Sequence, residues 1–200
     1  AACYAGLLAA QPMGFYSPQS LAADARRHGQ VVLRPCVAKS DVLARVERLA
    51  EPYERPVEAR SDLEALTHVD RTLAVRMGLA AVRGLGEDAA QAIVDARAQR
   101  PFTSLHDMAR RVRVRPGGFQ GALRRAEAIA RGDAIPDDSI GTRALTTAQW
   151  EALATSGALE SFGISRREGL WAAGLIALEG PDTLPHVVPG VQAPTLPGMS

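Results

Sequence analysis

In this 200-residue sequence, the spacing that best suits ligand binding is that of Gly84 and Gly86, two glycines separated by a single residue. An apolar stretch at 79–83 precedes them, and the acidic pair Glu87-Asp88 opens a helical pattern after them. Glycine adopts backbone angles that other residues avoid, so a tight turn can join two helices there. Because glycine has no side chain, a ligand can also approach the main chain closely at this turn.

This order of helix, Gly-apolar-Gly and helix is the layout of a helix-hairpin-helix element. The amides of Leu85, Gly86 and Glu87 would point outward at the start of the second helix. A helix start binds anions through its free N–H groups and the positive end of its dipole. Arg83 would add a charge beside the anion, while the side chain of Leu85 holds the two helices together. We therefore predict a site for backbone phosphate, contacted without regard to base sequence.

A plainer interpretation of the same residues stays open. A glycine often ends a helix, and an ordinary helix can simply begin after it. The side chains of Glu87 and Asp88 also count against an anion here, unless they lie on the far face of the helix. Residues 76–131 contain 11 arginines and 5 acids, a local charge of +6 in a chain of net charge +1. Such a basic zone suits a polyanion, although a solvated helical face has the same composition.

The residues around this turn extend the predicted interface. A helix capped by Ser104, with Asp107 at its third position, would turn Arg110 and Arg111 outward. A second, weaker hairpin at 153–159 has the single glycine Gly157, and a packed helical turn would explain it equally well. The predicted DNA-binding residues are Arg83, Gly84, Leu85, Gly86, Glu87, Arg110, Arg111, Gly157, Arg166 and Arg167.

The rest of the pattern predicts a mainly α fold with a small strand element. Ser17 and Pro18 begin a helix that ends near His28, and short strands are expected at 31–33 and near 73–79. The stripe of apolar residues in 41–50 has helical spacing, which predicts a helix there with Ser40 as its cap. Trp150 and Trp171 are expected in the core. From Gly180 onward the composition is rich in proline and glycine, which indicates an extended linker.

Composition excludes several other classes of protein. Apolar residues make up 46 % of the chain and charged residues 22 %, so wholesale disorder is excluded. No apolar run reaches the roughly 20 residues that span a bilayer, so we predict no membrane partner. Cys3, Cys36 and the four histidines form no cluster with metal-ligand spacing, and no serine has a partner base in view. We therefore expect no cofactor or metal in this chain, and two reduced thiols in the cytoplasm.

Several segments, taken together, resemble a known family. They are 11–18, the run Asp24-Ala25-Arg26-Arg27-His28-Gly29, the hairpin at 78–87, 101–111 and 154–171. They resemble the end of the fingers region and the hairpins of bacterial DNA polymerase III alpha subunits, especially the error-prone, damage-tolerance branch. The sequence departs from that family at Cys36 and Ala38, where the family has Asp and Asn.

The resemblance implies a division of the chain and a larger parent. Residues 1–39 would end the fingers region, 40–72 connect, 73–178 form the hairpin region with an insertion or loop at 113–143, and 179–200 form the linker. The parent would be a DNA-directed DNA polymerase used in translesion synthesis and damage-induced mutagenesis. Its catalytic aspartates, which bind Mg²⁺, would lie upstream of Ala1. This part would then be non-catalytic.

The resemblance also implies partners. Primer–template DNA would be held behind the active site, in a cytoplasmic, nucleoid-associated protein. A sliding clamp or damage-tolerance accessory proteins would bind elsewhere in the parent, because the stretch from Gln192 to Leu196 lacks an aromatic anchor. Two alternatives stay open: a stand-alone helix-hairpin-helix repair module, which would leave residues 1–35 without a purpose, and a protein-interaction scaffold, which would show no salt-dependent DNA binding.

Overall fold

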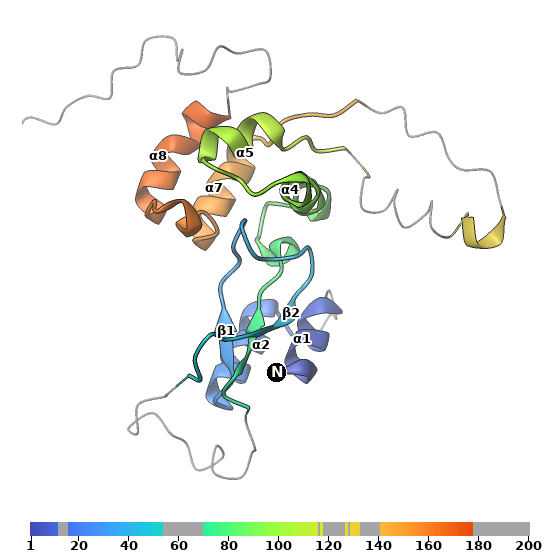
Figure 1. Cartoon of the computed structure of the whole chain (residues 1–200), viewed down its shortest axis with the longest axis vertical. Helices are drawn as coiled ribbons and strands as arrows, with labels where there is room; N and C mark the ends of the chain where they lie inside the picture. Colours follow the sequence, from blue (N-terminus) through green and yellow to red (C-terminus); the bar gives the residue numbers. More distant parts are fainter. Residues whose placement is uncertain are drawn as a thin grey trace, which may run out of the picture.

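We describe a computed structural model of the chain (Figure 1). It describes residues 1–11, 16–53, 70–115, 117, 127, 129–132 and 141–177. The predictions for 12–15, for most of the connecting segment and the insertion, and for the linker with Gln192 lie outside the described residues. The helices are α1 Ala2–Ala9, α2 Pro18–Arg27, α4 Glu87–Gln99, α5 Leu105–Arg111, α7 Thr147–Ser156 and α8 Arg166–Ile176, with 3-10 turns η2 Leu79–Ala81 and η3 Glu160–Phe162. The strands are β1 Val31–Leu33, β2 Arg45–Arg48 and β3 Leu73–Arg76.

The lower half of Figure 1 is a small sheet with two helices beside it. The strand order is β1-β3-β2, with β1 parallel to β3 and β2 antiparallel to it. Helix α1 contacts β2 and β3, and α2 contacts β1. Ser17 caps α2 by accepting from the Ser20 amide, with Pro18 at the first helical position, as the sequence predicts. The sheet therefore joins strands from all three segments that the sequence analysis separates.

The predicted helix at 41–50 is wrong, because part of this stretch is strand β2. Val46 lies opposite Val75 of β3, the central strand of the sheet. The proposed cap, Ser40, instead donates its hydroxyl to the Met77 carbonyl and is fully buried. Tertiary pairing with β3 has overridden the helical spacing of the apolar residues, as happens in short segments without local support.

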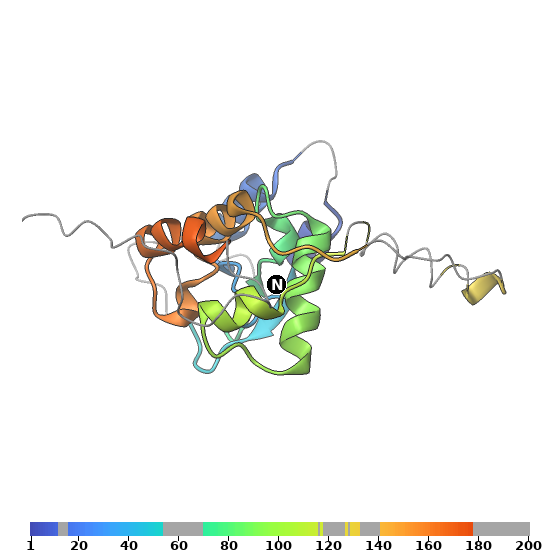
Figure 2. The same ribbon diagram turned by 90° about the horizontal axis from the view of Figure 1, so that it is seen from above.

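The upper half of Figure 1 holds the helices α4, α5, α7 and α8 around the main core. Seen from above, α4 and α5 lie on one side and α7 and α8 on the other (Figure 2). Trp150, Ile93 and Leu153 are buried between them, which confirms the core prediction for Trp150. Trp171 is 74 % exposed on α8, so its predicted place in the core is wrong. The inward side of α8 consists of Gly169, Ala173 and Ile176 instead.

Gly78 joins the two halves at a point where two stretches of main chain almost touch. A Cβ atom at this position would lie 2.7 Å from the Leu43 Cα atom and closer still to the Val42 carbonyl. The amides of Leu79 and Ala80 donate to the carbonyls of Asp41 and Val42 next to it. Any side chain at Gly78 would push these segments apart, and only glycine fits the space.

Candidate nucleic-acid interface

The first hairpin is a turn between η2 and α4. The expected first helix at 79–83 is only one 3-10 turn, because Val82 already has extended backbone angles. Gly84 has φ +90° and Gly86 has φ +82°, both in the region that favours glycine. Leu85, between them, is 2 % exposed and packs into the main core. The predicted Gly-apolar-Gly turn, with its apolar residue inward, is therefore present.

The outer side of this turn presents main-chain amides to open space. The Leu85 amide is not among them, because it donates to the Val82 carbonyl at 3.1 Å, which corrects that part of the prediction. Among the described residues, the amides of Gly86 and Glu87 have no acceptor. A Cβ atom at Gly86 would meet nothing within 4 Å. The start of α4 is thus accessible to an anion.

The two acids after the turn are partly engaged within the protein. Asp88 accepts a hydrogen bond from the Gly117 amide at 2.6 Å. Glu87 is half-buried and borders a cavity of about 250 Å³ that Leu8 and Met77 also line. Their charges oppose an anion at the turn, and the bond from Gly117 restricts where the Asp88 carboxylate can move.

Gln149 of α7 supports the hairpin from behind. Its Nε2 donates to the Leu85 carbonyl at 2.8 Å, and its Oε1 accepts from the Thr146 amide at 3.0 Å. Gln149 is also the third helical residue of α7 in a capping box with Thr146. Gln149 is not among the residues predicted from sequence, although the Thr146 to Gln149 spacing is the signature of such a box.

Arg83 and Arg111, both predicted to bind DNA, stand in different surroundings. Arg83 is exposed and has no side-chain partner among the described residues. The Arg111 guanidinium donates to the carbonyls of Ala96 and Arg100, at the end of α4. It also pairs with Asp107 at 3.0 Å and lies over the ring of Phe102. Arg111 therefore holds α4 and α5 together, and its guanidinium is occupied. Arg110 is half-buried on α5 and also makes contacts within the protein.

Asp107 is held in its charged form by this arrangement. Burial opposes ionisation of the carboxyl, but the Thr103 amide and the Arg111 guanidinium outweigh it and lower its pKa. Asp107 also accepts a second ion pair, from Arg100 at 2.7 Å. The Ser104 hydroxyl accepts from the Asp107 amide at 3.0 Å, which confirms the predicted cap of this helix.

The second hairpin joins α7 to α8 through η3. Gly157 ends α7 in the left-handed conformation, with φ +77°. A Cβ atom there would lie 2.7 Å from the Glu160 Oε1 atom and 3.2 Å from the Arg166 Nε atom. Glu160 pairs with Arg166 at 3.8 Å and with Arg34 at 3.1 Å. Side chains thus occupy the space in front of this turn. Arg167 is exposed beside it.

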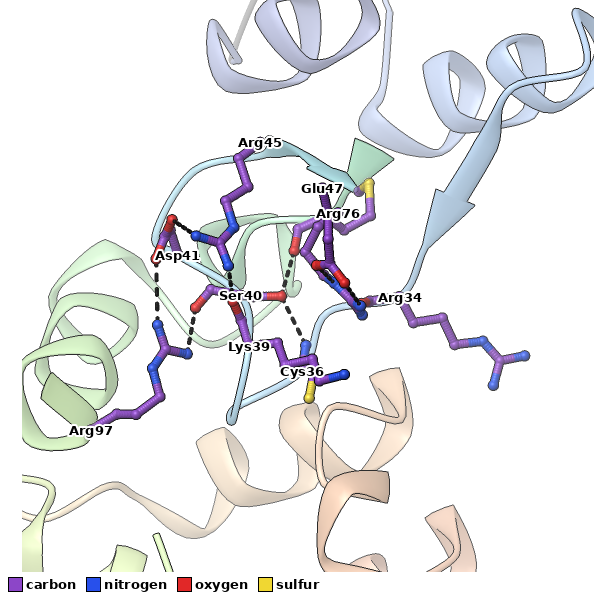
Figure 3. A network of polar contacts seen from close by, with 10 residues as sticks. Arg34, Cys36, Lys39, Ser40, Asp41, Arg45, Glu47, Arg76 and Arg97 are labelled. Carbon is purple, nitrogen blue, oxygen red and sulfur yellow. Dashed lines mark hydrogen bonds and ion pairs between the residues drawn. The ribbon is translucent and has the colours of Figure 1, made fainter. Parts of the chain in front are cut away.

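The loop 34–44 connects the hairpins to the sheet (Figure 3). Arg97 of α4 donates to the carbonyls of Val37 and Ser40 at 2.9 and 2.7 Å. It also pairs with Asp41 at 3.4 Å. The Val37 amide donates to the Ala158 carbonyl of the second hairpin. The sequence analysis found no role for this loop, and its departure from the family at Cys36 and Ala38 was the only sign that it mattered.

Arg76 and Glu47 form the adjoining part of the same network (Figure 3). Arg76 donates through two nitrogens to the two carboxylate oxygens of Glu47, each at 2.8 Å, across β3 and β2. This hydrogen bonding lowers the pKa of Glu47. Arg76 also donates to the Arg34 carbonyl at 3.0 Å. Of the arginines in the predicted basic zone, Arg76, Arg97 and Arg111 therefore serve the fold.

In the part of the chain that the structure describes, no three His, Cys, Asp or Glu residues gather where a metal ion could be held. None of the described helices is long and apolar enough to cross a membrane.

Comparison with known proteins identifies the hairpin region and its relatives. The family model described as "Helix-hairpin-helix motif" matches residues 29–134. The chain is 42 % identical over its whole length to an error-prone DNA polymerase of Mycobacterium tuberculosis (strain ATCC 25618 / H37Rv), and covers 14 % of that protein. It is 40 % identical to one from Nocardia farcinica, again over the whole chain and 14 % of the relative. The relative from Corynebacterium glutamicum is 38 % identical over 98 % of this chain and 13 % of its own length.

These matches confirm the resemblance to the error-prone branch of the polymerase family. They also confirm a mainly helical fold with a small sheet and a helix-hairpin-helix motif. The family model begins at residue 29, in the segment assigned to the end of the fingers, and therefore includes the sheet. The chain spans about one seventh of the length of these relatives.

Proposed function

The chain belongs to the helix-hairpin-helix family, and we propose that it grips duplex DNA by backbone phosphate at the first hairpin. The observation that carries the proposal is the open turn at Gly86. The amides of Gly86 and Glu87, at the start of the 13-residue helix α4, have no acceptor among the residues that the structure describes. A phosphate there gains two main-chain hydrogen bonds and the positive end of the helix dipole. Arg83 supplies a further positive charge.

The proposed contact is independent of base sequence, because main-chain amides and arginine meet the phosphate and not the base edges. The chain's share of a longer polymerase would be to hold the primer–template, with no step of nucleotide addition carried out by its own residues. The Mg²⁺-dependent chemistry would belong to aspartates elsewhere in such a polymerase. We extend the proposal to translesion synthesis and DNA repair in the cytoplasm at the nucleoid, with a clamp or accessory proteins contacting other parts.

The proposal is tested by replacing both glycines of the turn. In the variant Gly84→Ala with Gly86→Ala, each alanine is forced toward φ values that L-residues avoid, so the amides turn away from the phosphate. Affinity for a primer–template duplex, measured by fluorescence anisotropy, should fall at least about tenfold. Helix content measured by circular dichroism should change little, because both glycines lie outside the helices.

Gly163→Ala is the matched control. Gly163 also has a positive φ, +75°, with open space around it, so the alanine introduces backbone strain of the left-handed kind at a different turn. Its DNA affinity should stay within about twofold of the unchanged chain. If the folded double variant bound duplex as tightly as the control, the hairpin would not be the grip. A folded chain without DNA affinity at low salt would favour the protein-interaction scaffold instead.

A further inference from the structure

A groove beside the first hairpin gathers arginines from three separate segments. Its volume is about 700 Å³, and its walls come from α2, the residues after β1, the hairpin at 81–84 and α7. Arg26, Arg34 and Arg83 line it, and all three are exposed. Glu151 is the single acid among its described lining residues. We call this feature the arginine groove.

The surface between the arginines is small and mostly apolar. Ala22, Ala148 and Ala152 leave the groove wide, and Thr155 adds a hydroxyl. None of the described lining residues is aromatic, so the groove offers no ring on which a base could stack. What it offers is positive charge over a shallow apolar surface. This suits the phosphates and sugars of nucleic acid more than the bases.

We propose that the arginine groove holds a single strand of DNA by its phosphates, next to the duplex held at the hairpin. Its volume of about 700 Å³ lies in the range of small-molecule sites, about 300–1,000 Å³, and suits a short stretch of one strand. Arg83 and Gly84 belong to both the groove and the hairpin turn. A strand leaving the duplex at the turn therefore enters the groove directly.

Arg34 on the far wall has an exposed partner that a phosphate can replace, while Arg26 makes contacts within the protein and adds its charge to the groove. Arg34 pairs with Glu160 at 3.1 Å, with both side chains at least half exposed. Arg26 donates to the Val32 carbonyl at 3.4 Å. An exposed ion pair contributes little to stability, so exchanging Glu160 for a phosphate costs little.

The inference rests on the proposed function for the duplex but has its own test. Three probes are compared by fluorescence anisotropy against salt: a blunt duplex, the same duplex with a thymidine tail, and the free tail of about ten nucleotides. The unchanged chain should bind the tailed duplex about tenfold more tightly than the blunt one. In the variant Arg26→Ala with Arg34→Ala this gain should vanish. The slope of log affinity against log salt should fall by about 1.4, or 0.7 for each lost phosphate contact on a single strand.

Arg48→Ala is the control for the loss of charge. Arg48 is exposed at the end of β2 opposite Leu73, whereas the groove lies beyond the other end of the sheet, next to Arg34. This variant should keep the gain from the tail. A tail without effect on the unchanged chain, or an equal loss in the control, would overturn the inference and leave the hairpin grip intact. A third outcome separates the two proposals. If the blunt duplex does not bind, but the free tail binds the unchanged chain and not the variant Arg26→Ala with Arg34→Ala, the groove proposal holds and the hairpin proposal fails.

Discussion

The two hairpins of this protein use similar turns to different ends. At the first, a Cβ atom on Gly86 would meet nothing within 4 Å, and the amides of Gly86 and Glu87 have no acceptor in the described part of the chain. At the second, Glu160 and Arg166 lie within 3.2 Å of the place where a Cβ atom of Gly157 would be. Glycine allows the backbone to turn at both sites, but only the first turn remains open in front. A glycine in a hairpin therefore indicates the turn, and the side chains around it decide whether a ligand can reach it.

The second hairpin instead supports the first. Helix α7, its first half, carries Gln149, whose amide reaches the Leu85 carbonyl. The Val37 amide bonds to the Ala158 carbonyl in the same turn region. We infer that the two hairpins have different roles: the first binds DNA, and the second holds the first in position.

The largest expected effect is on stability, when the hydrogen bond from Gln149 to the first hairpin is removed. Gln149→Leu leaves the buried Leu85 carbonyl without a donor and removes the capping box of α7. The free energy of unfolding should fall by about 2–3 kcal/mol, as measured by urea denaturation. Gln99→Leu, at an exposed site at the end of α4, should change it by less than about 0.5 kcal/mol. Equal effects of the two substitutions would show that Gln149 does not brace the turn.

A smaller effect separates the arginines of the two hairpins. Arg83→Ala removes an exposed cation without a side-chain partner in the described part of the chain, so the salt slope of duplex binding should fall by about 0.9. Arg166→Ala removes a cation already paired with Glu160, and the slope should fall by clearly less. Titrations of both variants against salt test this. A larger loss for Arg166→Ala would make the second hairpin the main grip.

The smallest expected effect is on acid stability. Glu47 and Asp107 have lowered pKa values in the folded state, so the unfolded chain takes up protons first as the pH falls. Their stabilisation is complete above their ordinary values of 4.5 and 3.8, and is lost as the pH falls through the lower folded values. Asp107→Asn, in the first turn of α5, should flatten the dependence of unfolding free energy on pH below about 5. Denaturation curves that keep the slope of the unchanged chain would contradict this assignment.

The sequence predicts the turn well because its determinants are local. Gly84, Gly86 and the buried Leu85 between them are read directly from spacing, as are the caps at Ser17 and Ser104. The helix predicted at the position of β2 is wrong because the structure of this segment depends on pairing with β3, which lies far away in the sequence. The local pattern of residues does not indicate such a partner.

The candidate site was harder to predict from sequence than the fold, for a related reason. Arginines near each other in sequence have different tasks: Arg83 is exposed, while Arg97 and Arg111 bond to main-chain carbonyls. Counting charges over residues 76–131 cannot distinguish them. The arginine groove cannot be predicted from sequence, because Arg26 and Arg83 line the same groove only in the folded structure.

The close approach at Gly78 limits how this region can be recombined with others. A chimera that exchanged the hairpins at residue 78 would have to carry Val42 and Leu43 with them, because the incoming turn must match the main chain that it touches. The two contacting segments lie more than thirty positions apart in the sequence, so any single crossover between residues 43 and 78 separates them. The sheet and the first hairpin are thus expected to be inherited together as one unit. This agrees with the family model, which begins at residue 29 and includes both.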